Sequence, residues 1–224
     1  MGELTFTQLV PLLQGLLISL SLLLTVSLVG FCSGTMMSFC HLSRSRLLNL
    51  VAQVFDVLLR GTPPVVFLLV IFYGVTELVD MTAFTAAATA LGLRAGGYFG
   101  RIFEGAVKAV PSNQRLAAKS IGLSPTRAFV FVTLPQAYRH ALPGVANELS
   151  AQLKLTSLAF VVGVVELMRQ ARYLIAGGTG MMTVLLTTAA IYYLANLVVF
   201  LFFNFLERSG NSSSASPAKN GGVV

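Results

Sequence analysis

The sequence has few charged residues, and this scarcity excludes a water-soluble globular domain. Only 10% of its 224 residues are charged, whereas 55% are hydrophobic. Soluble domains carry about 25% charged residues. No charged residue occurs between Glu3 and Arg44, or between Arg172 and Glu207. Both gaps exceed the ~20 apolar residues that a helix needs to cross the hydrocarbon core, so the chain is predicted to be an integral membrane protein.

Residue sets that carry out chemistry are also missing. Cys32 and Cys40 are interpreted as packing residues, and two cysteines give no disulfide or metal framework. His41 and His140 lack carboxylate or cysteine partners at ligand spacing, so no metal site is expected. There is no phosphate-binding Gly-x-x-x-x-Gly-Lys-Ser/Thr loop, catalytic Ser-His-Asp set or catalytic carboxylate pair. The sequence therefore predicts a non-enzymatic subunit without catalytic residues or a cofactor of its own.

The basic residues predict the membrane topology. The net charge of +7 might suggest a nucleic-acid partner, but cytoplasmic loops of membrane proteins collect Lys and Arg. No nucleic-acid partner is therefore expected. The first apolar run is too long for a signal peptide and has no basic region before it, so it is predicted to be retained. Glu77 and Asp80 are expected on the external side. The residues expected on the cytoplasmic side are Arg44, Arg46, Lys108, Arg115, Lys119, Arg127 and Arg208.

These patterns predict an all-α polytopic membrane protein with about five transmembrane helices and a cytoplasmic C-terminus. Residues 46–60 resemble an interfacial lead-in, and Gly61-Thr62-Pro63-Pro64 turns the chain into the second span because prolines begin helices rather than continue them. The expected spans are 9–36, 62–79, 83–107, 141–165 and 184–206. Residues 1–8 form an external stub, 9–207 the transmembrane domain and 208–224 a disordered tail.

Glycines at four-residue spacing predict that a neighbouring helix approaches the first and the third span closely. Gly92, Gly96 and Gly100 form a smooth ridge on the third span, and Gly30 and Gly34 do the same on the first. Small residues at this spacing let helix backbones pack against one another in membranes. We therefore assign these glycines to helix packing.

A short polar helix is predicted between the third and fourth spans. Ser112 or Asn113 can cap its start, and Gly122 suits the left-handed residue at its end. Ser124 followed by Pro125 then predicts a second helix start. Between two strongly apolar segments, such a helix projects from the bilayer, where it can dock to a soluble partner. The alternative is an ordinary amphipathic loop helix.

This polar segment resembles the coupling motif of ABC importer permeases, Glu-Ala-Ala-x-x-x-Gly, nine residues, then Ile-x-Leu-Pro. Ala117, Ala118 and Gly122 fall at the family spacing, whereas Leu116 stands where the family has glutamate. Further segments resemble the polar amino-acid branch of this family in the family's order. They are Leu59-Arg60-Gly61-Thr62-Pro63-Pro64, Leu134-Pro135-Gln136-Ala137, Ala141-Leu142-Pro143, Thr156-Ser157-Leu158 and Glu166-Leu167-x-Arg169-Gln170-Ala171.

The resemblance implies a permease subunit of an ATP-driven importer in the bacterial cytoplasmic (inner) membrane. Its implied partners are ATPase subunits that bind the ATP, a second identical or similar permease, an extracytoplasmic substrate-binding protein and membrane lipid. The coupling loop would cover about residues 108–136. The residues expected to couple it to the ATPase are Arg115, Leu116, Ala117, Ala118, Lys119 and Gly122.

Charges at membrane depth are the candidates for solute contact, because an arginine at a helix centre costs about 2.5–3.5 kcal/mol on insertion scales. Arg94 replaces a family asparagine, and Leu155 replaces a family aspartate. Arg94 either pairs with Glu148 or a partner's acid, or forms with Lys154 a positive patch for solute carboxylates. The predicted substrate-pathway residues are Arg94, Tyr98, Glu148, Gln152, Lys154, Thr156 and Ser157.

Arg101 and Glu104 lie three residues apart, so they share a helix face and are expected to form a structural pair. In the resembled family the acid precedes the base, and here the order is exchanged. An ATP-independent channel or secondary transporter for small polar solutes is the alternative function, with Glu148 and Lys154 as a hint of a titratable relay. A scaffold membrane protein is a further alternative, although it would leave the intramembrane charges unexplained.

Overall fold

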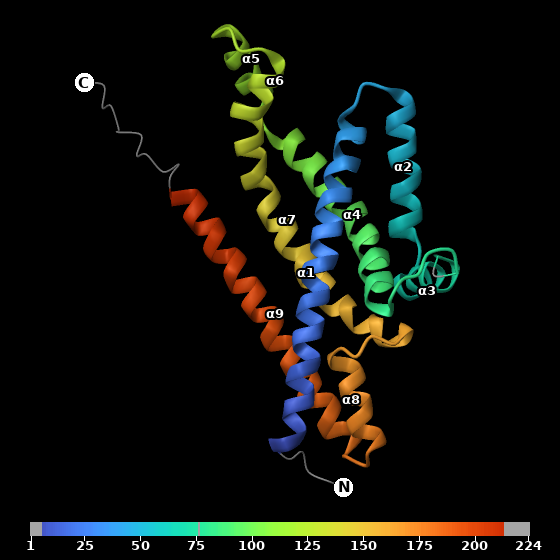
Figure 1. Cartoon of the computed structure of the whole chain (residues 1–224). Helices are drawn as coiled ribbons and strands as arrows, with labels where there is room; N and C mark the ends of the chain where they lie inside the picture. Colours follow the sequence, from blue (N-terminus) through green and yellow to red (C-terminus); the bar gives the residue numbers. More distant parts are fainter. Residues whose placement is uncertain (1–5, 76, 213–224) are drawn as a thin grey trace, which may run out of the picture.

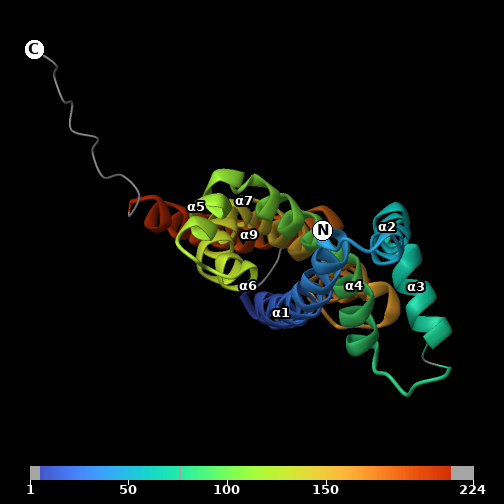
Figure 2. The same ribbon diagram turned by 90° about the horizontal axis from the view of Figure 1, so that it is seen from above.

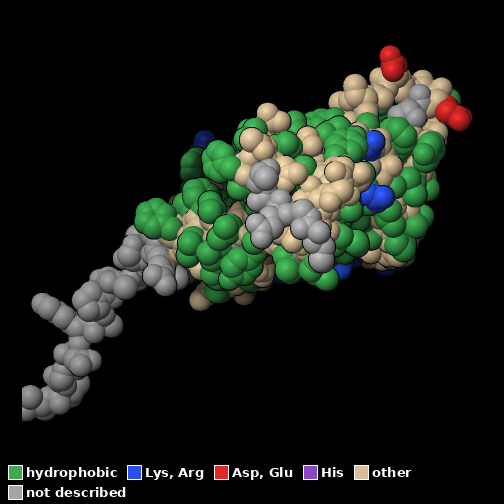
Figure 3. Space-filling model, turned by 90° about the horizontal axis from the view of Figure 1, so that it is seen from below, with side chains coloured by type: hydrophobic (Ala, Val, Ile, Leu, Met, Phe, Trp, Pro, Cys, Tyr) green, Lys and Arg blue, Asp and Glu red, His purple; other side chains and the backbone are tan. Residues whose placement is uncertain are grey.

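The computed structural model describes residues 6–75 and 77–212, and within these ranges the chain is helical without a strand (Figure 1). The long helices are α1 (Phe6–Leu42), α4 (Ala83–Ala109), α7 (Leu134–Leu155) and α9 (Met181–Ser212). The prediction of an all-α membrane fold is confirmed. Much of the surface seen in Figure 3 is hydrophobic with sparse charges, as expected for helices that face lipid.

The centre of the molecule is the packing of α1 against α4. A Cβ atom on Gly34 would lie 2.6 Å from the Cβ atom of Phe99, and one on Gly96 would lie 2.1 Å from the Ser33 Oγ atom. Side chains at these two positions would force the helices apart. The assignment of these glycines to helix packing is therefore confirmed, and the structure shows that the two ridges face each other. Toward the start of both helices, buried side chains such as Leu22, Val26 and Leu91 complete the core.

The second apolar region differs from the prediction. It consists of α2 (Arg46–Gly61) and α3 (Pro64–Val75), which are bent by 105° relative to each other. With 12 residues α3 is about 18 Å long, too short to cross a bilayer alone. The interval 62–79 is therefore not a single spanning helix. Instead α2 runs back beside α1, and from above α2 and α3 lie on one side of α1 and α4 (Figures 1 and 2).

The interpretation of 46–60 as an interfacial lead-in is not supported, because Asp56 within it faces the protein. Asp56 is 4% exposed, whereas apolar side chains around it, including Val54, Val57 and Leu58, are exposed. A water-exposed interfacial helix would instead expose its charged side chains and bury its apolar ones. Together α2 and α3 meet the length and composition of one broken span.

The number of spans stays a prediction. In the described part of the chain, α1 and α9 are long and apolar enough to cross a membrane. Up to four crossings result if each of the two bent pairs, α2 with α3 and Pro125–Val162 with Leu167–Ala176, counts as one. The 27-residue α4 lies outside this set because its glycines and Arg94 lower its hydropathy.

The two ends of the molecule carry different short elements. At one end α5 (Ser112–Ser120), α6 (Pro125–Ala128) and the π-helix η1 (Phe129–Thr133) lead into α7, and the α1–α2 turn lies at this same end (Figure 1). At the other end are the start of α1 and α8 (Leu167–Ala176). The 3₁₀ helix η2 (Thr156–Val162) connects α7 toward α8.

The expected boundaries change by a few residues. Helix α1 begins at Phe6, within the predicted stub, and α9 continues through Ser212, within the predicted tail. The remainder of both predicted segments, 1–5 and 213–224, lies outside the described residues. The expected span 141–165 corresponds to the later part of α7 followed by η2, so it is continuous with the helix that leaves the coupling loop.

Candidate functional site

The predicted coupling segment forms α5, but its start is not capped as expected. Pro111 occupies the N-cap position and no side chain caps the helix, so the prediction of a Ser112 or Asn113 cap is wrong. Proline fixes φ near −65° and has no N–H, which suits the entry to a helix without a capping side chain.

The end of α5 follows the prediction. The Leu123 N–H donates to the Ala118 carbonyl at 3.1 Å, and the Gly122 N–H donates to the Lys119 carbonyl at 3.0 Å. This is the Schellman pattern, and Gly122 has a φ of +82°. Immediately afterwards the Ser124 Oγ atom accepts from the Arg127 N–H at 3.4 Å and starts α6. The chain is thus reversed sharply at Gly122.

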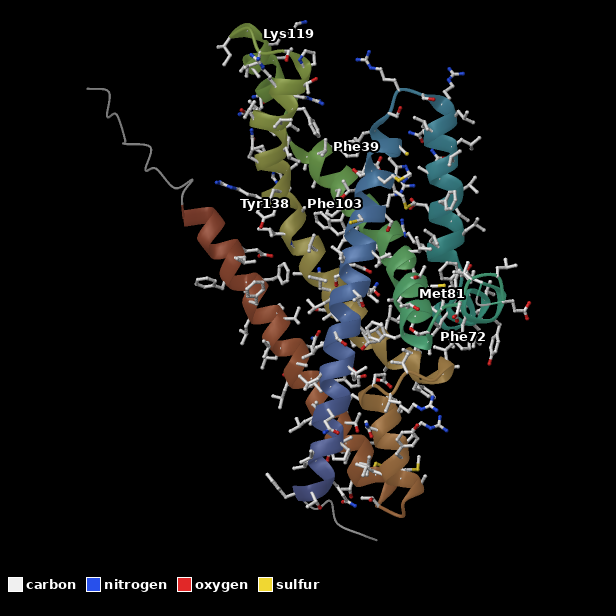
Figure 4. The ribbon with its side chains drawn as sticks, viewed as in Figure 1. Phe39, Phe72, Met81, Phe103, Lys119 and Tyr138 are labelled. Atoms are coloured by element: carbon white, nitrogen blue, oxygen red, sulfur yellow. The ribbon has the colours of Figure 1, made fainter. Side chains whose placement is uncertain are left out.

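The surface of α5 is open to a partner. Ala118 is the buried member of the predicted coupling residues, at 3% exposure, and anchors the helix on the elements beneath it. Arg115 and Lys119 are exposed, as are the apolar side chains Leu116 and Ile121. Lys119 marks this tip in Figure 4. A tip that mixes exposed cations with exposed apolar side chains suits docking into a groove on another protein.

A cavity of about 380 Å³ lies between α4, α7 and η2. It contains five of the seven predicted pathway residues. The lining side chains belong to Arg94, Tyr98, Glu148, Ala151, Lys154, Leu155, Ser157 and Leu158. Thus the structure brings together residues more than fifty positions apart, and the positive Arg94 and Lys154 share the cavity with one carboxylate.

Gln152 and Thr156 do not line the cavity, although they were predicted with the other five. Gln152 is buried and its Nε2 atom donates to the Glu148 carboxylate. Thr156 is buried and its hydroxyl donates to the Leu153 carbonyl at 2.7 Å. Both side chains are hydrogen-bonded to neighbours on α7 and do not line the cavity.

Arg94 forms no ion pair with a carboxylate of the described residues. Its Nη2 atom donates to the Tyr98 hydroxyl at 3.2 Å, and its guanidinium lies 5.0 Å from the centre of that ring. Its Nε atom is buried without a hydrogen-bond partner. The direct Arg94–Glu148 ion pair is therefore not formed, and Glu148 acts on Arg94 only across the cavity that both side chains line.

Arg101 has the opposite surroundings. Its Nη1 atom contacts the Glu104 carboxylate at 2.9 Å, which confirms the predicted pair, and Lys108 contacts the same carboxylate at 2.6 Å. The Arg101 Nε atom also contacts Asp56 on α2, and His41 Nε2 lies 3.4 Å from the same Asp56 oxygen. Sequence reasoning missed Asp56, although an aspartate in an apolar run was an available signal.

Another buried carboxylate, Glu166, joins three helices. It is 0% exposed and caps α8 by accepting from the Met168 and Arg169 N–H groups, each at 2.9 Å. The Tyr192 hydroxyl of α9 donates to it at 2.8 Å, and the Ser19 hydroxyl of α1 at 3.4 Å. The sequence marked Glu166 as part of a motif but gave it no role, because its partners lie far away in the chain.

Long apolar helices, an arginine without an ion pair in a cavity between helices and an exposed short helix at one end are the features of a membrane transport component. Residues 27–210 match the family described as binding-protein-dependent transport system inner membrane component. The chain belongs to this family, and the prediction of an ABC-transporter permease subunit of the amino-acid type is confirmed.

Relatives extend over most of the chain. The L-cystine transport system permease TcyL of Bacillus subtilis is 32% identical, covering 89% of this chain and 87% of that protein. The arginine transport system permease ArtQ of the same organism is 28% identical and covers 93% and 96%. A solved amino acid ABC transporter with histidines has a TM-score of 0.84 at 28% identity, covering 93% of this chain and 100% of that one.

Proposed function

We propose that this chain forms part of the translocation path of an ATP-driven importer for polar amino acids or related solutes. The transported solute carries at least one carboxylate that the importer holds tightly. In this proposal separate ATPase subunits bind and hydrolyse ATP, so the chain has no cofactor. A second identical or similar permease, an extracytoplasmic substrate-binding protein and the lipid of the bacterial inner membrane complete its surroundings. The relatives named for arginine and L-cystine support the amino-acid class.

The observation that carries the solute proposal is that Arg94 lines the cavity without an ion pair to a described carboxylate. Arg94 and Lys154 supply two cations against the single carboxylate of Glu148. A planar guanidinium holds a carboxylate through two hydrogen bonds. Because Arg94 engages a neutral hydroxyl rather than an acid, a solute carboxylate can take up its charge. An acidic amino acid or a carboxylate-bearing conjugate fits this cavity better than a cationic amino acid.

Uptake by Arg94→Asn and Arg94→Ala tests the solute proposal. A charge-assisted hydrogen bond is worth about 1.5–3 kcal/mol, so the apparent affinity for the native solute should fall about 10- to 150-fold. The matched control is Arg46→Gln, which removes an exposed arginine remote from the cavity. Expression and assembly are checked for each variant. Wild-type uptake by both Arg94 variants, or a native solute resembling lysine or arginine, would refute the anionic-solute proposal.

The proposed coupling role of α5 has a separate test at Gly122. A β-branched residue is strained at its φ of +82°, and nothing lies near enough to clash with an added Cβ atom. Gly122→Val should therefore distort the helix end without disturbing the core, lowering ATP-driven transport and the stimulation of the ATPase. Gly105→Val, on α4 and also in open space, is the control for a glycine without positive φ. Normal transport and normal stimulation in Gly122→Val would show that α5 does not couple.

Co-purification separates this proposal from an ATP-independent channel or secondary transporter. The permease should bring down an ATPase whose activity rises with loaded binding protein. Uptake that persists in vesicles without ATP or an ATPase partner would favour the alternative.

A further inference from the structure

One arginine that does not line the cavity contacts a residue that does. Arg60 is in the last turn of α2, and its Cζ atom lies 5.0 Å from the centre of the Tyr98 ring. Arg94 lies at the same distance from this ring, which lines the cavity. The two arginines come from different helices, so Tyr98 connects α2 with the cationic wall of α4. Cations over aromatic rings attract the ring electrostatically.

The backbone of α4 leaves room for this approach. A Cβ atom on Gly97 would lie 3.2 Å from Arg60 Cγ and 3.5 Å from Arg60 Cδ. The aliphatic stem of Arg60 therefore passes over a position that has no side chain, next to the tyrosine that its guanidinium covers. Gly97 is thus a determinant of where Arg60 lies, as distinct from the glycines that pack against α1.

Asp56 holds the other side of Arg60 without neutralising it. The Arg60 Nη1 atom is 3.8 Å from Asp56 Oδ2, one helical turn away. The same oxygen also contacts Arg101 and His41. In this cluster three cations, Arg60, Arg101 and Lys108, face the two carboxylates of Asp56 and Glu104. Arg60 is the most distant of Asp56's partners, so it carries the unbalanced charge.

The positive charge of Arg60 acts on a residue that lines the cavity. The Glu148 carboxylate interacts electrostatically with Arg94 and also with Arg60. We propose that Arg60 is a positioning residue for solute recognition: it holds the Tyr98 ring beside Arg94 and adds a positive field from α2, while Asp56 and Gly97 fix its place. This inference rests on the proposed carboxylate-bearing solute. It makes α2 part of the solute site, so that movement of α2 relative to α4 changes the cavity's affinity for anions.

The test compares Arg60→Gln and Arg60→Lys in the complete transporter reconstituted with its ATPase and binding protein. Glutamate, glutamine and lysine serve as probes with the same backbone and different side-chain charge. A partly exposed cation–π contact corresponds to about a two- to fivefold effect. We expect Arg60→Gln to raise KM for the acidic probe by this factor with Vmax nearly unchanged. Arg60→Lys should restore part of the affinity because it keeps the charge but loses the planar group.

A second variant keeps the charge and moves the side chain. Gly97→Ala is compatible with the helix, but its Cβ atom is expected to push the Arg60 stem by a few tenths of an ångström. It should raise KM for the acidic probe in the same direction, by less than Arg60→Gln. Gly105→Ala is the control, because a Cβ atom there meets nothing.

Failure of this inference differs from failure of the proposed function. If Arg94→Asn raises KM but Arg60→Gln leaves it unchanged, Arg60 is a helix-packing residue and the inference is overturned alone. If Arg60→Gln and Arg60→Lys lower Vmax equally without a change in KM, the inference is likewise overturned. If neither Arg94 nor Arg60 variants change KM for the acidic probe, the anionic-solute proposal itself fails.

Discussion

Two arginines on α4, seven positions apart in the same helix, have opposite surroundings. Arg101 contacts two carboxylates, Asp56 from α2 and Glu104 from its own helix. Arg94 contacts none among the described residues and donates to the Tyr98 hydroxyl at the edge of a cavity. A buried or half-buried charge that is paired contributes to the fold, whereas one left unpaired at a cavity is available for a ligand. The difference separates a structural charge from a functional one.

The largest loss of stability is expected when Arg101 and Glu104 are exchanged, which restores the order of acid and base found in the resembled family. Were the two an isolated pair, the double variant Arg101→Glu/Glu104→Arg would be tolerated. Because Asp56 contacts position 101, the exchange instead places two carboxylates together and Lys108 beside an arginine. Breaking a buried pair costs about 3–5 kcal/mol. The loss in the free energy of unfolding should lie at the low end of this range, because the Arg101 side chain is 39% exposed.

The measurement is the free energy of unfolding, or the melting temperature of the purified complex in detergent. The control Arg44→Glu reverses an exposed charge in the turn between α1 and α2 and should change stability by less than about 0.5 kcal/mol. A double variant as stable as the wild type would mean that Asp56 does not depend on Arg101.

A smaller effect is expected from Asp56→Asn. This change keeps the shape of the side chain but removes the charge that Arg101, Arg60 and His41 share. Hydrogen bonds to charged groups contribute about 1.5–3 kcal/mol, and we expect a loss of about 2 kcal/mol in the free energy of unfolding. Asp80→Asn, in the exposed connection between α3 and α4, is the matched control. Equal melting temperatures for the two variants would contradict the assigned role of Asp56.

Local features of this chain were predictable from sequence because neighbouring residues determine them. The glycine at position 122 ends α5 with positive φ, and Ser124 with Pro125 starts the next helix. The glycine ridges of α1 and α4 were also recognisable, since their spacing alone defines a smooth face. The prediction of a Ser112 or Asn113 cap at the start of α5 was wrong, because Pro111 occupies the N-cap position.

Features that depend on distant partners were missed. Helix α2 was interpreted as an interfacial lead-in, because Arg101, the partner that pairs with its Asp56, lies 45 positions later in the chain. Glu166 was likewise noted without a role, because Ser19 and Tyr192 reach it from other helices. At the cavity, Arg94 was identified from its charge at membrane depth, whereas Arg60 became visible as its neighbour through the Tyr98 ring.

The account is tested most directly by measuring stability and uptake together for Arg94→Gln and Arg101→Gln in one preparation of the transporter. Arg94→Gln loses a hydrogen bond to the uncharged Tyr98 hydroxyl and a ring contact but no ion pair, so its stability should fall by about 1 kcal/mol or less, while KM for the acidic solute rises at least tenfold. Arg101→Gln should do the reverse, lowering the melting temperature more with KM nearly unchanged. If Arg94→Gln lost stability as much as Arg101→Gln and kept wild-type KM, the division between a structural and a solute-binding arginine would be wrong.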